Sequence, residues 1–354
     1  MMQDRPLRIE VLVNSPGPHD HVRVREPFHA LQRLGIDCRI HERPFRFSRC
    51  IRPHSLVIWQ RPLPESWARQ SEHLQWLRER GCLLFTEWDD HPDLFPEPIQ
   101  RQLVASEFAP LVLCHALHSS SAVLVKALTS HHPLGLVFEN GPAEVPPLNG
   151  HKQLQSPLRV LIGNQNRQAD HASLVAGLRA WLQADPTLQI VCVGDDALAA
   201  ALPSHRVERH ARLAYGLYRQ LLRSCQMALL PLSRSLPNRC KTVIKWAEAA
   251  AESVVVVAGP ELYGAVSADA HGELTAIVVP QLDALVPAAR ALAAHPQQRL
   301  ALAARAHRWV EQAWCLERLL PQRLELYQRI WERRDQLDRR LLQRLATRVP
   351  LLLP

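Results

Sequence analysis

The sequence predicts an α/β protein made of two doubly wound, Rossmann-like domains that face a central cleft. The chain has 354 residues, which is long for one core and favours two domains of ordinary size. Short apolar runs alternate with longer helical patterns in both halves, as expected for parallel sheets covered by helices on both faces. One stretch rich in proline, glycine and polar residues, 141–157, interrupts this alternation.

The first domain is expected at residues 1–150. Its helical patterns include 22–34 and 65–80, and the second of these stops at Gly81, a residue that commonly follows a helix C-terminus. The strand candidates are short apolar runs that lie between these patterns: 7–13, 37–42, 55–60, 82–88, 111–117 and 134–140.

The second domain is expected at residues 158–320, after a linker at 141–157 that has neither helical nor strand periodicity. Its helices are predicted at 169–184 and around 215–225. Its strand candidates are again short apolar runs: 158–164, 188–195, 227–232, 253–259 and 274–280.

The last segment, 321–354, is predicted to contain one long basic helix over 321–349. Arginines alternate there with leucine, isoleucine and tryptophan at helical spacing. We expect this helix to pack back on the first domain. Contact of its basic and apolar faces with an anionic membrane is the alternative.

Composition and processing signals indicate a globular cytoplasmic protein. Hydrophobic residues make up 47% of the chain and charged residues 21%, which is enough apolar material for a core. The N-terminus lacks the pattern of a signal peptide, and no apolar run approaches the roughly 18–20 residues that span a bilayer. The eight cysteines are dispersed without a CxxC pair, so we expect reduced thiols and no zinc site.

The formal net charge of +8 raises nucleic acid, an anionic membrane surface or a phosphorylated ligand as partners. The arginines are spread over the whole chain, and no aromatic and basic motif of a nucleic-acid-binding module occurs. A phosphate-bearing ligand or a lipid therefore fits the charge better than nucleic acid does.

The stretch "NRCKTVIKWAEAAAE" (238–252) places charged residues among alanines just before the apolar run "SVVVVAG". Asn238 follows a proline and is expected to cap a helix. Successive gaps of four, three and four residues put the charged side chains on one narrow stripe of that helix. The stripe comprises Lys241, Lys245, Glu248 and Glu252.

Two interpretations of the stripe are open. In the first, Lys245 and Glu248 form a surface ion pair worth about 0.2–0.5 kcal/mol. In the second, the helix start binds a phosphate. Arg239 and Lys241 fall in the first turn, where the helix dipole disfavours cations. A bound phosphate would reverse that penalty, because free backbone N–H groups and both cations would converge on it.

The segment "MALLPLSRSLPNRCKTVIKWAEAAAESVVVVAG" resembles the donor-binding segment of retaining glycosyltransferases with the two-domain GT-B fold, of the group-1 or family-4-like kind. "LRVLIGNQNRQADHASLVAGLRAW", "VCVGDD" and "YRQLLRSCQMALLPL" support this resemblance. It covers residues 157–312 and extends to the first half only through the alternating pattern. It implies that the second domain binds a nucleotide-sugar and that the first binds the acceptor.

Glu248 matches the second glutamate of this family, which binds the nucleotide ribose. The family's first glutamate, a contact to the donor sugar, falls at Cys240 in this chain. The family's glycine and proline after the helix are replaced by Ser253 and Val255. These departures leave the donor sugar open and leave catalytic competence in question.

The resemblance also implies which residues bind the diphosphate. Lys241 and Lys245 are similar to those of a variant branch with two lysines in this loop. Arg167 matches in position a basic residue that the family uses, although a solvated loop arginine would look the same. Because cations and helix N–H groups can stabilise a diphosphate leaving group, no obligatory metal is expected.

The acceptor side is expected in the first domain, where "FTEWDDHPDLF" ends a strand with several ionisable residues. Asp89, Asp90 and His91 are candidates to orient or deprotonate an acceptor hydroxyl, with Asp90 and His91 as catalytic residues. A polar turn in which an aspartate caps a short helix is the alternative. Gly17 and His19, in the loop after the first strand, are further acceptor-side candidates, although Gly17 equally suits a tight turn.

The sequence thus predicts a cytoplasmic glycosyltransferase, with possible attachment at the inner membrane face, that transfers a sugar from a nucleotide donor to a glycan, sugar or lipid-linked acceptor. Retention of anomeric configuration is implied by the resemblance alone. A sugar-nucleotide epimerase of the same fold and a catalytically inactive GT-B-like binding protein are the alternatives.

Overall fold

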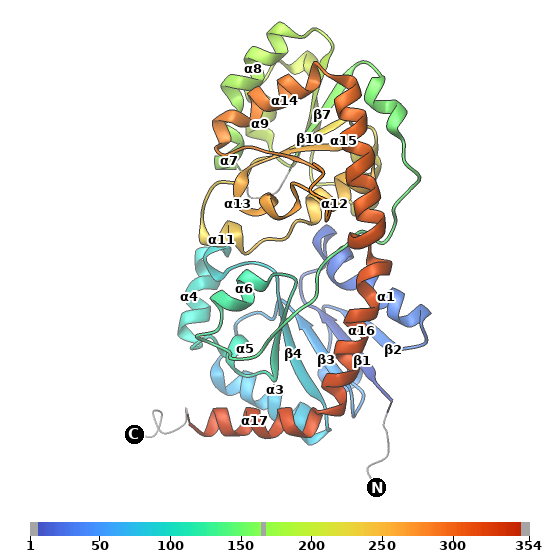
Figure 1. Cartoon of the computed structure of the whole chain (residues 1–354). Helices are drawn as coiled ribbons and strands as arrows, with labels where there is room; N and C mark the ends of the chain where they lie inside the picture. Colours follow the sequence, from blue (N-terminus) through green and yellow to red (C-terminus); the bar gives the residue numbers. More distant parts are fainter. Residues whose placement is uncertain (1–5, 164–167, 348–354) are drawn as a thin grey trace. The chain divides into compact units, whose positions relative to one another are not determined.

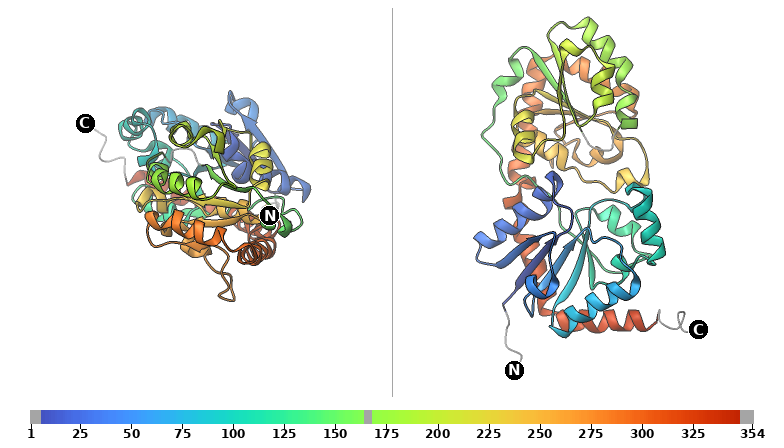
Figure 2. Two further views of the ribbon diagram at one scale, coloured as in Figure 1. Left: turned by 90° about the horizontal axis from the view of Figure 1, so that it is seen from above. Right: turned by 180° about the vertical axis from the view of Figure 1, so that it is seen from behind.

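The computed structural model describes residues 6–163 and 168–347. The chain divides into two compact units, which we call unit 1 (Met1–Glu139 with Leu319–Pro354) and unit 2 (Asn140–Arg318). Each unit contains a six-stranded sheet with helices packed along it (Figures 1 and 2). The predicted class, α/β with two doubly wound Rossmann-like domains, is confirmed.

The sheet of unit 1 is entirely parallel and has the order β2-β1-β3-β4-β5-β6. Its order reverses between β1 and β3, and ligands of doubly wound folds bind beyond the carboxyl ends of the strands at such a switch point. The strands are β1 (Arg8–Val13), β2 (Asp37–Glu42), β3 (Leu56–Gln60), β4 (Leu83–Trp88), β5 (Ala116–Ser119) and β6 (Gly135–Val137).

The helices of unit 1 follow the strands in alternation, with one difference from prediction. The apolar run 111–117 was expected to be a strand, but its first residues belong to helix α5 and only its end enters β5. Pro110 lies in the first turn of α5, where proline is favoured. A continuous apolar run carries no period that could separate the two structures. The helices are α1 (Glu26–Arg33), α2 (Phe47–Cys50), α3 (Trp67–Glu79), α4 (Glu97–Ala105), α5 (Ala109–Val112) and α6 (Ala122–Ala127).

The C-terminal segment forms two helices rather than the single long helix expected. These are α16 (Leu316–Glu332) and α17 (Arg334–Ala346). In α16, the buried Tyr327 hydroxyl lies 2.7 Å from Nε2 of His118, on β5. In α17, Asp338 accepts from Nε of Arg78, on α3, at 2.5 Å. The chain therefore returns to unit 1 after completing unit 2.

The sheet of unit 2 is also parallel, in the order β12-β11-β10-β7-β8-β9. Strand β9 was not predicted, because Val207 is its single apolar residue and three polar residues follow it. The strands are β7 (Leu158–Gly163), β8 (Leu188–Val193), β9 (Val207–His210), β10 (Met227–Leu230), β11 (Val255–Ala258) and β12 (Ile277–Val278).

The helices of unit 2 bury their apolar faces against this sheet in two clusters, one on each side. They are α7 (Gln168–Ala172), α8 (Val175–Ala184), α9 (Asp196–Ala201), α10 (Tyr215–Arg223), α11 (Leu236–Arg239), α12 (Ile244–Ala251), α13 (Pro260–Tyr263), α14 (Leu285–Ala293) and α15 (Pro296–Trp309).

The segment 141–157, interpreted from the sequence as a linker, packs within unit 2 and contains a short 3₁₀ helix, Gly150–Leu154. Lys152 is buried, and its ammonium donates to the carbonyls of Arg223 (3.0 Å) and Glu252 (2.6 Å). Burial lowers the pKa of Lys152 to about 8. These contacts fasten the segment near the amino ends of the strands of unit 2.

Across residues 6–163 and 168–347, no helix combines the length and the apolar character needed to cross a membrane. The cysteines are free thiols.

Candidate functional site

The carboxyl ends of β3 and β4 and the loop after β1 bring four charged residues together in unit 1. Nη1 of Arg23 lies 2.9 Å from Oε1 of Glu87 and 2.7 Å from Oδ2 of Asp89. Arg23 and Glu87 are almost completely buried. Nη2 of Arg61 lies 2.5 Å from Oδ2 of Asp89. We call Arg23, Arg61, Glu87 and Asp89 the carboxyl-edge cluster.

Arg61 has an unusual backbone, with φ at 46°. Its N–H donates to the carbonyl of Glu87 at 3.0 Å, which turns the chain sharply as it leaves β3 and aims the guanidinium at Asp89 and Asp90. A residue other than glycine costs roughly 1–3 kcal/mol in a sparsely populated region, and such residues concentrate at functional sites. The strain at Arg61 is therefore a reason to regard this edge as functional.

The pKa values of the two carboxylates of the cluster shift in opposite directions. Burial raises the pKa of Glu87 to about 7. Burial alone would raise the pKa of Asp89, but Arg23 and Arg61 outweigh it and hold that pKa well below its usual range. Burial and the same two arginines lower the pKa of His19 to about 4. Nε2 of His19 lies 3.3 Å from Nη1 of Arg61, so this nitrogen is the acceptor of a neutral imidazole. The site thus presents an ionised aspartate beside a neutral histidine near pH 7.

The other acceptor-side candidates occupy defined positions in the same region. Gly17 precedes a 3₁₀ turn, Pro18–Asp20, and its backbone is extended, with φ at 172°, so it makes a turn that does not require glycine. Asp90 accepts from Nη2 of Arg61 at 3.0 Å. His91 turns away toward Asp93, whose N–H donates to Nδ1 of His91 at 3.3 Å. His91 itself therefore caps the following turn.

Arg61 was not among the predicted site residues, although it directly follows a predicted strand, and that position is the signal by which it could be recognised. Arg23 lies in the turn after β1, and Glu87 lies near the end of β4. Their mutual distances arise from the order of β1, β3 and β4 in the sheet, and three short loops carry no trace of that order.

In unit 2, the single helix expected over 238–252 is two helices, α11 and α12. Asn238 lies inside α11 and does not cap a helix; Ser235 is the capping residue, accepting from the N–H of Asn238 at 3.2 Å. Three consecutive β-branched residues, 242–244, separate the two helices, and such residues have low helix propensity. The four-membered stripe is therefore not formed.

Lys245 and Glu248 do meet on α12. Nζ of Lys245 lies 3.0 Å from Oε2 of Glu248 and 4.2 Å from the ring centroid of Tyr218, on α10. Burial would lower the pKa of Lys245, but Glu248 and Tyr218 together raise it. Glu248 is almost completely buried. Lys245 and Glu248 thus form a largely buried ion pair at the start of α12. Their attraction is stronger than that of an exposed surface pair, because water screens it less.

The remaining donor-side candidates take three different positions. Lys241 is half-buried between α11 and α12. Cys240 is completely buried in unit 2, so the position of the family's first glutamate is a core position in this chain. Glu252 leaves the stripe and accepts from Nε of Arg223 at 2.7 Å. Arg167 lies outside the described residues.

Residues 167–324 match the family model described as "Glycosyl transferase-like". This range contains β8 to β12, the Lys245–Glu248 pair and the carboxyl end of β10. The match supports the resemblance predicted from the segment around 227–259.

Solved structures with the same fold include several glycosyltransferases. HepE of Anabaena in complex with UDP and glucose is 13% identical and matches with a TM-score of 0.62 over 90% of this chain and 99% of that chain. Sucrose-phosphate synthase from Thermosynechococcus elongatus is 14% identical, with a TM-score of 0.64 over 92% and 99%. An α-glucosyltransferase in complex with UDP-glucose and DNA is 9% identical, with a TM-score of 0.66 over 91% and 100%. No curated protein matches the sequence.

Two features of unit 2 were not anticipated. Nδ1 of the buried His171 lies 2.6 Å from Oδ2 of Asp195, in the loop that follows β8. The backbone N–H of Ser233, after β10, donates to Oδ1 of Asp170 at 3.2 Å. Both contacts tie α7 to the carboxyl edge of the sheet. Within the described ranges, no group of three or more His, Cys, Asp or Glu residues is placed to hold a metal ion.

Proposed function

We propose that the protein is a glycosyltransferase that transfers a sugar from a nucleotide-sugar donor to a glycan, sugar or lipid-linked acceptor, with retention. The observation that carries this proposal is the glycosyl transferase-like match over 167–324, which includes the Lys245–Glu248 pair. HepE, a protein of the same fold, has been solved with UDP and glucose, which supports a UDP-sugar as the first donor to test.

Unit 2 would bind the nucleotide at the carboxyl ends of β7 and β10. The N–H groups at the start of α12 are available to a diphosphate, with Lys241 and Lys245 as its cations. The carboxylate of Glu248 retains acceptor capacity beside Lys245 and can receive the ribose hydroxyls. Preorganised cations would stabilise the negative charge that develops on the leaving diphosphate, and the transfer would need no obligatory metal.

Unit 1 would bind the acceptor, with Asp90 as the group that orients or deprotonates the hydroxyl. Asp89 is committed to Arg23 and Arg61, whereas Asp90 pairs with Arg61 and is the more exposed of the two carboxylates. His91 faces Asp93 and would need to turn to reach an acceptor. Asp90 is therefore the stronger catalytic candidate.

The first experiment combines the purified chain with a panel of nucleotide sugars and follows thermal stabilisation and nucleotide release. Acceptor-dependent release of UDP or GDP supports transfer. Interconversion of the sugar without an acceptor supports an epimerase instead. Stabilisation without any turnover supports a binding protein, for which the buried Cys240 would be the reason. Absence of stabilisation by every nucleotide sugar contradicts the proposal, and unchanged turnover in EDTA supports metal independence.

A second experiment uses amine labelling, because the lysines of the chain are Lys126, Lys152, Lys241 and Lys245. Lys126 is exposed and lies in unit 1, so it serves as the internal control. Lys152 is buried. A UDP-sugar should slow labelling of Lys241 and Lys245, read by mass spectrometry, and leave Lys126 unchanged. Equal labelling with and without a UDP-sugar that stabilises the protein would place the donor elsewhere.

The protein would be cytoplasmic and would attach peripherally to the inner face of a membrane. Helix α17 carries the required basic residues, and Leu342 on it is 44% exposed. Vesicles with and without anionic lipid, tested by flotation, distinguish this contact from simple packing: binding that requires anionic lipid and falls with salt supports attachment.

A further inference from the structure

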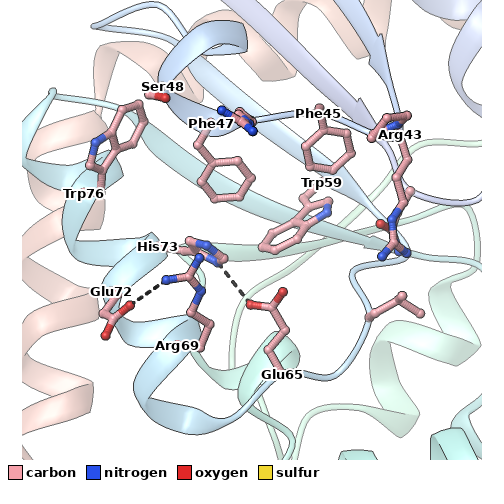
Figure 3. Close-up of a pocket in the computed structure, with 14 residues that line it drawn as sticks. Arg43, Phe45, Phe47, Ser48, Trp59, Glu65, Arg69, Glu72, His73 and Trp76 are labelled. Atoms are coloured by element: carbon pink, nitrogen blue, oxygen red, sulfur yellow. Dashed lines mark hydrogen bonds and ion pairs between the residues drawn. The ribbon is translucent and has the colours of Figure 1, made fainter.

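A pocket of about 720 Å³ lies in unit 1 at the switch point of its sheet (Figure 3). Its volume falls within the ~300–1,000 Å³ typical of small-molecule sites. The loop after β2, strand β3 and helix α3 form its walls.

Aromatic rings form one wall of this pocket. The ring of Phe47 lies 5.1 Å from that of Trp59, edge to face, and 6.2 Å from that of Phe45, stacked. Trp76 is 6.4 Å from Phe47. Figure 3 shows these rings next to one another, with Glu65, Arg69 and Glu72 below them. The wall therefore presents several aromatic ring surfaces to the pocket, and some of this apolar surface is partly exposed.

The rest of the lining is polar and carries more positive than negative charge. Arg69 pairs with Glu72 at 3.0 Å, and His73 lies 3.3 Å from Glu65. Arg43 and Arg46 are exposed and make no ion pair with any described residue. These two guanidiniums are available to an anionic ligand, and guanidinium forks suit carboxylates and phosphates.

Three buried polar atoms of the lining lack hydrogen-bond partners in the described part of the chain. Trp59 is 4% exposed, and its Nε1–H has no acceptor. Oε2 of Glu65 and Nδ1 of His73 approach each other without hydrogen-bond geometry. Buried polar groups of folded proteins are normally satisfied by protein, water or ligand. The pocket therefore presents one donor and a pair of groups that a ligand's hydroxyls could satisfy.

We propose that this pocket binds an anionic saccharide that carries a carboxylate. Ring faces would pack against the apolar side of a sugar ring, Arg43 and Arg46 would bind the carboxylate, and Glu65 and Glu72 would accept from hydroxyls. The two glutamates disfavour a lipid chain, because their charges would lose water without gaining a partner. A neutral sugar would leave the two arginines unused.

Asn14 connects the pocket with the carboxyl-edge cluster. Its side chain lines the pocket, and its Nδ2 donates to the carbonyl of Arg61 at 2.9 Å. Arg61 in turn holds Asp89 and Asp90. A saccharide seated on the aromatic wall would thus be linked to the proposed acceptor-activating residues through Asn14 and Arg61. Its role as the acceptor rests on the proposed function, whereas its binding can be measured without any donor.

The test uses tryptophan fluorescence and calorimetry of the whole chain with tetragalacturonate, a uronic-acid tetrasaccharide, and with cellotetraose, its neutral counterpart. We expect saturable binding of tetragalacturonate and binding of cellotetraose weaker by roughly tenfold or more, since charge-assisted bonds are about twice as strong as neutral ones. The double variant R43Q/R46Q should lose that preference, and Trp76→Leu should weaken both ligands.

Arg49→Gln is the matched control, because Arg49 is exposed on the same short helix as Phe47 and does not line the pocket. The proposal is overturned if tetragalacturonate does not bind, if R43Q/R46Q binds it as tightly as the original chain, or if cellotetraose binds equally well. A change of tryptophan fluorescence with anionic vesicles but not with tetragalacturonate would assign the pocket to lipid. That result would also overturn the proposal. Thermal stabilisation by UDP-sugars in the same variants reports on the proposed donor site separately.

Discussion

Each unit buries a carboxylate that is paired with two arginines, at the carboxyl edge of the sheet in unit 1 and near the amino edge in unit 2. In unit 1 the carboxyl-edge cluster joins Arg23 and Arg61 to Glu87 and Asp89. In unit 2 the buried Glu252, which follows α12 and precedes β11, accepts from Nε of Arg219 at 2.9 Å, near the amino ends of the strands. Because doubly wound folds bind ligands at the carboxyl edge, the first arrangement is placed to serve chemistry and the second to serve stability.

The local structure around the two groups supports this difference. The carboxyl-edge cluster includes Arg61, which has a positive φ, and lies beside a neutral histidine, His19. Glu252 is followed by Ser253, which also has a positive φ, of 57°, but there the carbonyl of Glu252 accepts from Lys152 and holds the segment 141–157 to the unit. The same physical device, a buried carboxylate with two arginines, therefore has two uses in one chain. Each prediction below breaks one side of this comparison.

The largest expected effect is on catalysis and comes from Asp90→Asn. The variant should fold normally and lose about 10²–10⁴-fold in kcat, because an amide cannot accept the acceptor proton. Turnover with a UDP-sugar and acceptor measures this, and stabilisation by the UDP-sugar should be unchanged. Asp93→Asn, an exposed neighbour, is the control. Full activity in the Asp90 variant would remove it from the catalytic site.

Next in size is a loss of stability from Glu252→Ala. This change leaves the buried Arg219 without its carboxylate, which typically costs about 3–5 kcal/mol. Urea unfolding should show the loss in unit 2, and nucleotide binding by the folded fraction should not change. Glu273→Ala removes an exposed carboxylate and should cost less than about 0.5 kcal/mol. Impaired nucleotide affinity in the Glu252 variant would contradict a purely structural role.

A smaller effect is expected from Lys245→Met, which retains much of the side-chain volume beside Tyr218. Loss of one diphosphate cation should weaken binding of a UDP-sugar by roughly tenfold, the equivalent of ~1.4 kcal/mol. Calorimetry measures the affinity. Lys126→Met, at an exposed position of unit 1, should bind normally. If the Lys245 variant also binds normally, the Lys245–Glu248 pair is structural, like the pair around Glu252.

The smallest effect is a difference in acid sensitivity between the units. Burial lowers the pKa of His132 to about 4 and that of His118 well below its ordinary value, and His19 behaves like His132. These groups are neutral when folded and bind protons when unfolded below about pH 6.5. Their stability contribution is complete above that pH and is lost as the pH falls toward 4.

Unit 1, which holds all three histidines, should therefore lose protection before unit 2 between pH 7 and pH 5. Hydrogen exchange at the two pH values measures this, with β5 reporting on unit 1 and β10 on unit 2. In unit 2 the buried His171 lies against Asp195, whose carboxylate can balance a charge on the ring. Earlier loss of protection in unit 2 would contradict the attribution of acid sensitivity to the three buried histidines of unit 1.

Much of the fold could be predicted from the sequence alone. The alternation of apolar runs and helical patterns predicted the parallel sheets, because a strand buried on both faces must be apolar throughout. The segment 227–259 predicted a likeness to glycosyltransferases, which the family-model match over 167–324 supports, and β1, β3 and β10 lie where the apolar runs do. Where apolar runs lacked a period, as at 111–117, or were missing, as at β9, local pattern failed.

Only the tertiary structure decided how the sites are built. The pairing of Lys245 with Glu248 followed from helical spacing, but the break between α11 and α12, the burial of Cys240 and the departure of Glu252 to Arg219 depended on packing. The carboxyl-edge cluster and the aromatic pocket exist because the order of β1, β3 and β4 brings separate loops together. Periodicity along a chain records which face each residue buries, whereas the neighbours across a sheet are selected by the free energy of the whole fold.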